Sequence, residues 1–446
     1  MSILPINLDD LINARSVYRI PGLVLTEHEF RVPLDHAQPQ GEQITIFARE
    51  VRATAKRDAA LPWLVFFQGG PGFGAPRPLN NSGWLKRALQ DYRVLLLDQR
   101  GTGRSTPVTF QTLARLSSPQ AQADYLTHFR ADAIVADAEL IRHALAGPDT
   151  PWTALGQSYG GFCVLTYLSR APQGLAGALI IGGLAPLDRS VDDIYRATYR
   201  RTLGKNRRYY ERYPQDAAHS QRIADYLLRH IVPLPGGGRL SARRFQQIGM
   251  GFGASDGFEN VHYLLEHAFV TGVNGPEINF VFLRGLEAMQ SFETNPIYAL
   301  LHEPCYCQGA ASTWSAQRML AEFPEFDLQA AASGQAPLMF TGEMIYPWMF
   351  EDYAYLRPLQ GAAEILAAYG GWPPLYDPSA LAANRVPVAA LSYYDDMYVE
   401  LVFAEQTARR VAGLKLWVTN EYEHNGLRAD GERVLGRLLD MLAGNV

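Results

Sequence analysis

The feature that most restricts the fold is a series of short, uninterrupted apolar runs, most of which end in a glycine-containing loop. The runs are Pro62–Phe67, Val94–Leu97, Trp152–Leu155 and Leu175–Leu184. Such a run is typical of a strand that is buried on both faces. Between the second and third runs, apolar residues recur at helical spacing over about 119–146. Strands that alternate with helices predict a mostly parallel central sheet with helices on both faces.

The segments around these runs complete the predicted organisation. Residues 24–53 alternate between apolar and polar, which indicates two or three antiparallel strands at a sheet edge. The strand–helix alternation stops after about residue 187 and resumes at Val386–Leu391 and Leu414–Thr419, before a closing helix at about 430–442. We therefore expect a core formed by residues 1–187 and 386–446, interrupted by a large, mainly helical cap at 188–385.

Composition excludes several other classes of protein. The chain has 446 residues, of which 48% are hydrophobic, and this argues against a disordered protein. The formal net charge of −5 is too balanced for a nucleic-acid binder with a basic footprint. The longest uncharged apolar run, Leu175–Leu187, is shorter than the roughly 18 residues that a membrane-spanning helix needs. We expect neither a nucleic-acid partner nor a membrane, and the oligomeric state stays open.

The cysteines and the first residues bear on the compartment. Residues 1–16 lack a basic stretch followed by an apolar stretch, so we expect no signal peptide. The chain has only 3 cysteines, whereas an oxidised secreted scaffold would need more. These features predict a cytoplasmic protein.

A candidate nucleophile lies directly after the third apolar run. Gly156-Gln157-Ser158-Tyr159-Gly160 matches G-x-S-x-G, and it follows a predicted strand and precedes a predicted helix. The small residues on either side allow a sharp turn, which lifts the serine oxygen above the carboxyl edge of the sheet. There the amides at the helix N-terminus favour negative charge. Ser158 is therefore the predicted nucleophile.

A serine nucleophile also needs donors for the oxyanion of its tetrahedral intermediate. One donor is expected to be the backbone N–H of Tyr159, the residue after the nucleophile. The other is expected near Gly70, in the loop 68–72 that follows the first buried strand. The glycines of that loop allow its backbone to approach a substrate closely.

The general base and its acidic partner should follow the nucleophile along the chain, in the order Ser, Asp/Glu, His. Only His424 lies beyond the resumed sheet, in the loop after the strand Leu414–Thr419. The acid should follow the preceding strand, where Asp395 and Asp396 are both candidates. Neighbouring side chains in an extended chain point in opposite directions, so we expect one to face His424 and the other to cap the next helix, near Val399.

These motifs together resemble a known family. The segments 68–72 (QGGPG), 98–105 (DQRGTGRS), 156–161 (GQSYGG), 394–399 (YDDMYV) and 423–428 (EHNGLR) look like those of the prolyl aminopeptidases, or proline iminopeptidases, of the α/β-hydrolase fold. The resemblance implies that Ser158 is the nucleophile and His424 the base. In related sequences the acid lies nine residues after the proline that opens its strand, which here is Pro387, so the resemblance favours Asp396 over Asp395. The family commonly has His where this chain has Gln68, a change that leaves a hole made of backbone amides possible.

The resemblance also implies a substrate, namely a peptide with a free N-terminal proline. In the family, glutamates of the helical cap accept hydrogen bonds from the proline amine. Glu303 and Glu343 match this pattern, because both precede the strand at Val386. The aromatic residues Trp314, Tyr346 and Trp348 are candidates for the wall around the proline ring.

Two weaker signals favour structure over function. Cys305 and Cys307 lack a second pair, so we expect no zinc site there. The predicted function uses no metal and no cofactor. Basic residues cluster in the cap at Arg196, Arg200, Arg201, Lys205, Arg207, Arg208 and Arg212. Such a cluster is more often a solvated helix face than a phosphate site.

Three functions compete on this evidence. A serine exopeptidase that releases N-terminal proline through an acyl-enzyme agrees with all the motifs. An esterase or amidase of other specificity could use the same core. A catalytically silent binding protein disagrees with the presence of Ser158, a following acid and His424.

Overall fold

The structure is a computed structural model that describes residues 12–273 and 275–446. The prediction of no signal peptide concerns residues that lie mostly outside these ranges. Among the described residues, none of the helices combines the length and apolar character needed to cross a membrane.

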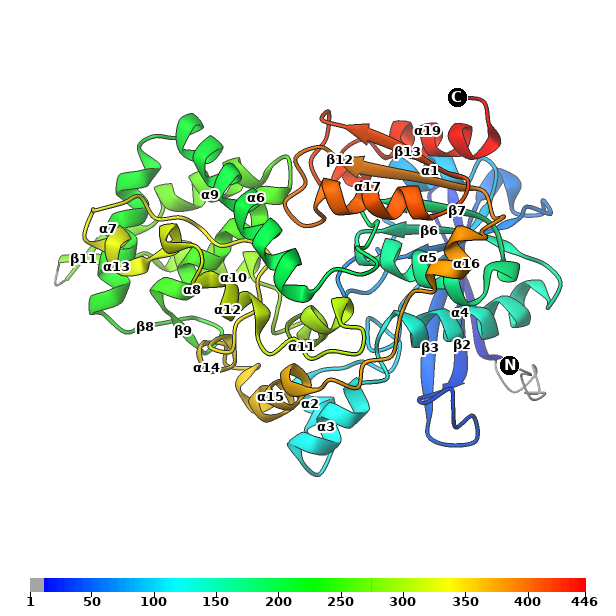
Figure 1. Cartoon of the computed structure of the whole chain (residues 1–446), viewed down its shortest axis with the longest axis horizontal. Helices are drawn as coiled ribbons and strands as arrows, with labels where there is room; N and C mark the ends of the chain where they lie inside the picture. The colour runs from blue at the N-terminus through cyan, green and yellow to red at the C-terminus, as the bar shows by residue number, and fades with distance from the viewer. Residues whose placement is uncertain (1–11, 274) are drawn as a thin grey trace.

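A nine-stranded sheet forms the centre of the molecule, in the order β1-β2-β3-β5-β4-β6-β7-β12-β13 (Figure 1). Its strands are β1 Ile12–Ile20, β2 Leu23–Pro33, β3 Gln43–Ala53, β4 Trp63–Phe67, β5 Arg93–Leu97, β6 Trp152–Gln157, β7 Leu175–Ile181, β12 Val388–Tyr393 and β13 Leu414–Thr419. The strands from β5 to β13 pair in parallel, while β1, β2 and β3 form an antiparallel edge. The predicted mostly parallel sheet and its antiparallel edge are confirmed.

Helices cover both faces of this sheet. Those of the core are α1 Gly83–Ala88, α2 Phe110–Leu113, α3 Pro119–Leu126, α4 Ala131–Ala146, α5 Tyr159–Arg170, α17 Leu401–Arg410, α18 Gly426–Ala429 and α19 Gly431–Ala443. Helices α1 and α19 share one apolar cluster with the sheet, and α4 and α5 share another on the opposite face. Strand β4 is buried along its whole length because it lies between the two clusters.

The helix expected over about 119–146 is instead two helices, α3 and α4, separated by residues 127–130. The break has a physical cause in the packing below it. Phe129 turns into the core, and the carbonyl of His128 accepts a hydrogen bond from the buried side chain of Arg100 at 2.6 Å.

The chain between β7 and β12, residues 182–387, forms the insertion. Its elements are α6 Val191–Arg212, α7 Asp216–Arg229, α8 Ala242–Gln246, α9 Gly257–Glu266, α10 Phe280–Met289, α11 Pro296–Leu301, α12 Ser315–Leu320, α13 Leu328–Ala332, α14 Met349–Asp352, α15 Gln360–Ala368, α16 Pro378–Ala382 and the hairpins β8 Val232–Pro233 with β9 Arg239–Leu240 and β10 Phe269–Gly272 with β11 Gly275–Ile278. Most of it forms a lobe beside the sheet, with β11, α7 and α13 farthest from it (Figure 1). This lobe has an apolar cluster of its own, which includes Phe245, Phe252 and Phe340.

The last part of the insertion returns along the core. The side chains of Arg130 and Arg170 donate to the carbonyls of Pro373 and Pro374. Leu381, in α16, accepts a hydrogen bond from the Ala412 amide at 3.0 Å. Residues from about 373 onward therefore pack with the core before β12 begins.

The basic cluster of α6 only partly follows its prediction. Arg200 and Arg207 are exposed, as a solvated face requires. The prediction is wrong for Lys205, which is only 2% exposed. Lys205 is buried because α6 crosses the boundary between the insertion and the core, where a carboxylate of the core pairs with it.

Candidate active site

The predicted nucleophile lies on a sharp turn between β6 and α5. Ser158 has φ +54° and ψ −126°, a conformation that L-residues rarely adopt. Glycines on both sides make the turn possible. A Cβ added at Gly160 would lie 2.0 Å from the carbonyl oxygen of Phe67, and one added at Gly156 would lie 2.2 Å from the carbonyl oxygen of Gly160. The strained turn holds the Ser158 side chain at the carboxyl end of the parallel strands.

The loop that follows β4 lies directly beside this serine. A Cβ added at Gly69 would be 3.6 Å from Ser158 Oγ, so the backbone of residues 69–70 passes next to the hydroxyl. Gly70 adopts φ +137°, which suits glycine. Tyr159 is the first residue of α5, and an amide at that position has no acceptor within its own helix. The two predicted oxyanion donors, Gly70 and Tyr159, thus both belong to segments that adjoin Ser158.

The segment 98–105 supports this loop, a role that the sequence reasoning did not assign. Gln99 Nε2 donates to the carbonyl of Gln68 at 3.1 Å. The buried carboxylate of Asp98 accepts hydrogen bonds from the amides of Ala75 (2.9 Å) and Arg104 (2.8 Å). These bonds hold the chain on both sides of the glycines in a fixed position.

The predicted base makes its hydrogen bond to the second of the two candidate acids. His424 Nδ1 lies 2.7 Å from Asp396 Oδ2. The other oxygen of Asp396 accepts the amides of Tyr398 (2.9 Å) and Val399 (3.1 Å), and these bonds fix the orientation of the carboxylate. The side chain of Asp396 is buried, so no solvent competes for the imidazole.

Asp395 faces away from the histidine. Its carboxylate lies 3.1 Å from Arg208 and 3.8 Å from Arg201, both in α6. The expectation that the aspartate not bonded to His424 caps the following helix is wrong for Asp395. Helix α17 begins at Leu401, and its N-terminal amide at Val402 is bound by Glu400 instead.

Ser158 and His424 approach the same point at the end of β7. The Ser158 amide donates to the carbonyl of Ile181 at 2.8 Å. A Cβ added at the next residue, Gly182, would be 3.1 Å from His424 Cε1. His424 Nε2 is buried and has no hydrogen-bond partner within residues 12–273 and 275–446. The imidazole is therefore bound on its Nδ1 side and free on the side that a base uses.

The electrostatic surroundings favour the protonated form of this histidine. Burial lowers the pKa of His424, but the charge and hydrogen bond of Asp396 outweigh it. Glu343 and Glu423 add in the same direction, so the pKa of His424 lies above its ordinary value. A base of this kind is poised to accept a proton and to hold the resulting charge.

Glu343 of the insertion lies close to this centre. The hydroxyl of Tyr298 donates to Glu343 Oε1, and His302 Nε2 lies 3.4 Å from Glu343 Oε2. Burial and the nearby Glu343 raise the pKa of Tyr298 well above its usual value, which keeps the phenol protonated as a donor. These two partners fix the place of the carboxylate, and its charge acts on His424.

Glu303 has a different setting, and the prediction that it binds substrate loses its support. Its two carboxylate oxygens accept the amides of Ser315 (3.2 Å) and Ala316 (2.9 Å) at the start of α12. Burial raises the pKa of Glu303, although these bonds oppose the shift. The side chain caps a helix, so its oxygens are already occupied.

The aromatic residues around the site also differ from those expected. Trp314 bonds Glu364 at the surface, and Tyr346 bonds Tyr199 inside the insertion. The rings that do lie at the site include Tyr398 and Tyr393, 4.8 and 5.9 Å from the His424 ring, and Tyr298, whose hydroxyl bonds Glu343. Sequence reasoning missed Tyr298 because the helix α11 that carries it has no motif of its own.

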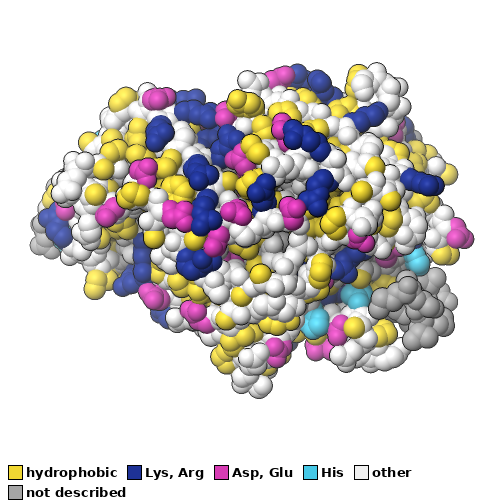
Figure 2. Space-filling model, in the orientation of Figure 1, with side chains coloured by type: hydrophobic (Ala, Val, Ile, Leu, Met, Phe, Trp, Pro, Cys, Tyr) yellow, Lys and Arg dark blue, Asp and Glu magenta, His cyan; other side chains and the backbone are white. Residues whose placement is uncertain are grey.

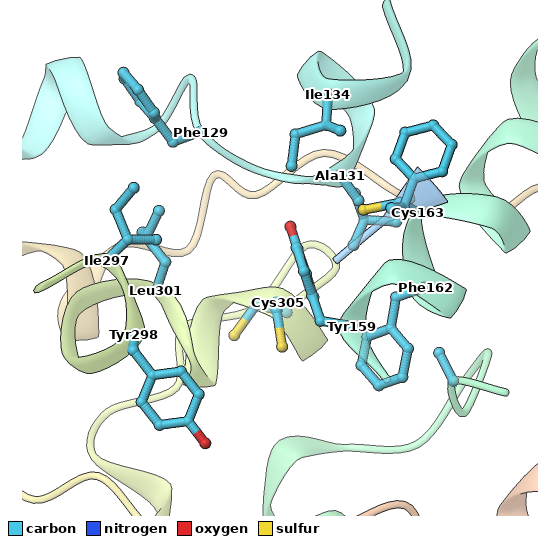
Figure 3. Close-up of a cluster of buried hydrophobic side chains, with 14 of the residues drawn as sticks. Phe129, Ala131, Ile134, Tyr159, Phe162, Cys163, Ile297, Tyr298, Leu301 and Cys305 are labelled. Carbon is cyan, nitrogen blue, oxygen red and sulfur yellow. The ribbon is translucent and has the colours of Figure 1, made fainter. Parts of the chain in front are cut away.

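Helix α11 forms the contact between the insertion and the nucleophile region. A Cβ added at Gly72 would be 2.8 Å from Ile297 Cβ, so α11 rests on the glycine loop. Figure 3 shows Cys305 beside Tyr159 of α5, with the α11 side chains Ile297, Tyr298 and Leu301 on the other side of Cys305. The three cysteines are buried and unpaired with one another. Within the part of the chain that the structure describes, His, Cys, Asp and Glu form no cluster able to hold a metal ion.

Comparisons with known proteins place these features in context. Residues 62–226 match the family model of the alpha/beta hydrolase fold. The chain is 53% identical to a proline iminopeptidase of Aeromonas sobria over 423 residues, which cover 95% of this chain and 97% of that one. It is 36% identical to a proline iminopeptidase of Aspergillus aculeatus over 427 residues, 94% of either chain.

Proposed function

This chain belongs to the proline iminopeptidase family, and from that membership we propose that it is a serine exopeptidase that releases proline from the amino end of peptides. The observation that carries the proposal is the placement of His424. Its Nδ1 is bound to Asp396, its Nε2 is free, and its ring lies at the end of β7 beside the backbone of Ser158.

In the proposed mechanism, Ser158 Oγ attacks the carbonyl carbon of the N-terminal proline while His424 Nε2 takes its proton. Asp396 keeps the imidazole in the tautomer with the proton on Nδ1 and stabilises the imidazolium. The amides of Gly70 and Tyr159 bind the oxyanion. His424 then returns the proton to the leaving amine, which frees the rest of the peptide. The prolyl-enzyme is hydrolysed by a water that His424 activates.

The substrate's amine requires an acceptor, and we propose Glu343 for this role. A prolyl ammonium carries two N–H donors, and a carboxylate binds such a group more strongly than a neutral acceptor does. The hydroxyl of Tyr298 and the imidazole of His302 hold the Glu343 carboxylate in place. Since the insertion supplies Glu343 and the core supplies Ser158, we propose that the insertion is a cap at 188–385 that admits only the amino end of a peptide.

The proposed setting is cytoplasmic, where peptides with a free N-terminal proline would be the substrates. The support is chemical: three buried cysteines remain as free thiols, as a reducing compartment allows. The proposed reaction uses the chain's own side chains and amides.

The first test compares proline p-nitroanilide with its N-acetyl form. We expect cleavage of the free amine only, and no cleavage of either compound by Ser158→Ala. Equal cleavage of both compounds would instead support an esterase or amidase of other specificity, because no amine would then be recognised.

A second test compares the two glutamates. Glu343→Gln is expected to raise KM for proline p-nitroanilide by about tenfold or more, since it removes a charged acceptor worth about 1.5–3 kcal/mol. Glu303→Gln is the matched control, and we expect it to lower thermal stability with KM unchanged. A larger KM effect at Glu303 would reverse the assignment.

A further inference from the structure

Three cations of α6 point toward the loops that carry the acid and the base. Arg201, Lys205 and Arg208 are four and three residues apart, a spacing that places them on one side of a helix. On the face shown in Figure 2, dark-blue and magenta side chains lie interspersed where α6 approaches α17. These three cations belong to the larger basic cluster that the sequence analysis assigned to a solvated face.

The partners of this row adjoin the site. Lys205 Nζ pairs with Glu423, the residue before His424. Arg208 lies 3.1 Å from Asp395, the residue before Asp396. Arg201 forms two bonds of 2.7 Å to Glu400, which caps α17. Helix α6 therefore binds both loops. In each loop it contacts the residue that directly precedes His424 or Asp396 in the sequence.

A second segment of the insertion holds the same loop from another direction. The His424 amide donates to the carbonyl of Gly253 at 3.0 Å. Asn425 exchanges two hydrogen bonds with Ser255, at 3.1 and 2.9 Å. The histidine loop is thus bound to the insertion at two consecutive residues, through the backbone of His424 and the side chain of Asn425, while the core binds the His424 ring.

From these contacts we propose that Lys205 is a positioning residue, through which the insertion sets the orientation of His424 by way of Glu423. The inference rests on the proposed function, in which His424 is the base. Lys205 is suited to the task because it is 2% exposed, so that its ammonium has little access to solvent and depends on Glu423. A small displacement of a base is costly, since about 1 Å can reduce a rate about a hundredfold.

The charges around His424 give the proposal a distinctive pH signature. Asp396, Glu343 and Glu423 act on the imidazole, and Tyr393 and Tyr398 pack against it. Without the ammonium of Lys205, the charge of Glu423 is uncompensated and the pKa of His424 rises. Without the carboxylate of Glu423, the pKa of His424 falls. The two variants should therefore shift the pH profile in opposite directions.

The experiment measures kcat and KM for proline p-nitroanilide across pH with Lys205→Met, Lys205→Arg and Glu423→Gln. We expect Lys205→Met to lower kcat by roughly 10- to 100-fold with KM little changed, because the misplaced group is the base and not the amine site. The acid limb of kcat/KM should move to higher pH in Lys205→Met and to lower pH in Glu423→Gln. Lys205→Arg should recover most of kcat.

Arg196→Gln is the matched control, because Arg196 lies on the same helix but pairs with Glu322 at the surface. It should leave kcat and the pH profile unchanged. If Lys205→Met does not fold, as judged by circular dichroism, Glu423→Gln and the double variant Lys205→Met/Glu423→Gln carry the test. The double variant removes both charges and should lose no more activity than the worse single variant.

Unchanged kcat and pH profile in Lys205→Met and Glu423→Gln, or shifts of their pH profiles in the same direction, would overturn the proposal. A fluorophosphonate, which reacts with activated serines, distinguishes failure of the positioning role from failure of the proposed function. If the wild type is labelled at Ser158 but the Lys205 variants are labelled equally fast, the positioning role is wrong. If the wild type is neither labelled nor active, the proposed function itself is wrong.

Discussion

At the scale of single residues, the site depends on which of two adjacent carboxylates meets His424. Strand β12 ends at Tyr393, and the Asp396 amide then bonds the Tyr393 carbonyl at 3.4 Å in a turn. The turn directs Asp396 to the imidazole and leaves Asp395 to the cations of α6. Alternation along an extended strand predicts that the two aspartates differ in direction, but it does not say which one faces the histidine.

We predict that Asp396→Asn lowers kcat by about four orders of magnitude, because the imidazole loses the group that fixes its tautomer. Asp395→Asn, a neighbour of the same chemistry, should change kcat far less. Steady-state kinetics on proline p-nitroanilide measure both. A larger loss at Asp395 would mean that the acid is assigned to the wrong residue.

The pH dependence should report the raised pKa of His424. A protonated imidazole accepts no proton, so kcat/KM is lost as the pH falls through this pKa. Because the pKa lies above its usual 6.5, the acid limb should lie above pH 6.5. The rate of fluorophosphonate labelling should follow the same limb, since that reagent has no amine to titrate. An acid limb below pH 6.5 in both measurements would contradict the assigned surroundings.

At the scale of elements, the turn between β6 and α5 decides whether the nucleophile is presented at all. Gly160 and Gly161 start the helix because α5 passes close to two strand ends. A Cβ added at Gly161 would lie 2.6 Å from the Gly183 carbonyl oxygen. Gly160, the last residue of the G-x-S-x-G pattern, and Gly161 after it thus meet steric limits near the ends of β4 and β7, which a sequence motif records without revealing the contacts.

Gly160→Ala tests these limits. The added methyl group would meet the backbone of Phe67, which cannot move without displacing β4, so we expect a loss of about 3 kcal/mol or more in the free energy of unfolding. Gly204→Ala is the control, since nothing lies within 4 Å of a Cβ in that part of α6. It should stabilise by about 0.5–1 kcal/mol. Chemical denaturation distinguishes the two, and equal effects would refute the steric explanation.

At the scale of the whole molecule, buried ionic groups join segments that are far apart in the sequence. Arg100 bonds both oxygens of Asp137 (2.8 and 2.6 Å) and the carbonyls of Leu34 (2.8 Å) and His128 (2.6 Å). The antiparallel edge, α4 and the break before α4 therefore meet at one guanidinium. Lys205 likewise joins the insertion to the histidine loop, through Glu423.

We predict that Arg100→Met lowers the free energy of unfolding by about 3–5 kcal/mol, because it removes both guanidinium bonds to the buried Asp137 carboxylate and leaves it only His36, at 2.8 Å, as a side-chain partner. Lys86→Met, which breaks an exposed pair with Glu432, should cost at most about 1 kcal/mol. Urea denaturation at neutral pH compares them. Similar small losses in both would show that the Arg100 pair has little weight.

The same pair gives stability a pH dependence. Burial raises the pKa of Asp137, but Arg100 outweighs it and the pKa lies below its usual value. A lowered carboxyl pKa adds stability that is complete above the unfolded pKa and is lost as the pH falls. Wild-type stability should therefore decline in acid more steeply than that of Arg100→Met.

The sequence by itself determined the parallel sheet, its antiparallel edge and the candidate positions 158 and 424, with 395 and 396 as alternatives for the acid, because apolar runs and glycine turns follow from local sterics and burial. Only the tertiary structure decided that His424 bonds Asp396 and not Asp395, that Glu303 caps α12, and that Lys205 is buried. Each of these depends on which distant segment a side chain meets. The sequence shows the same carboxylate or ammonium whether its partner in the fold is water, a helix amide or a charged side chain of a distant loop.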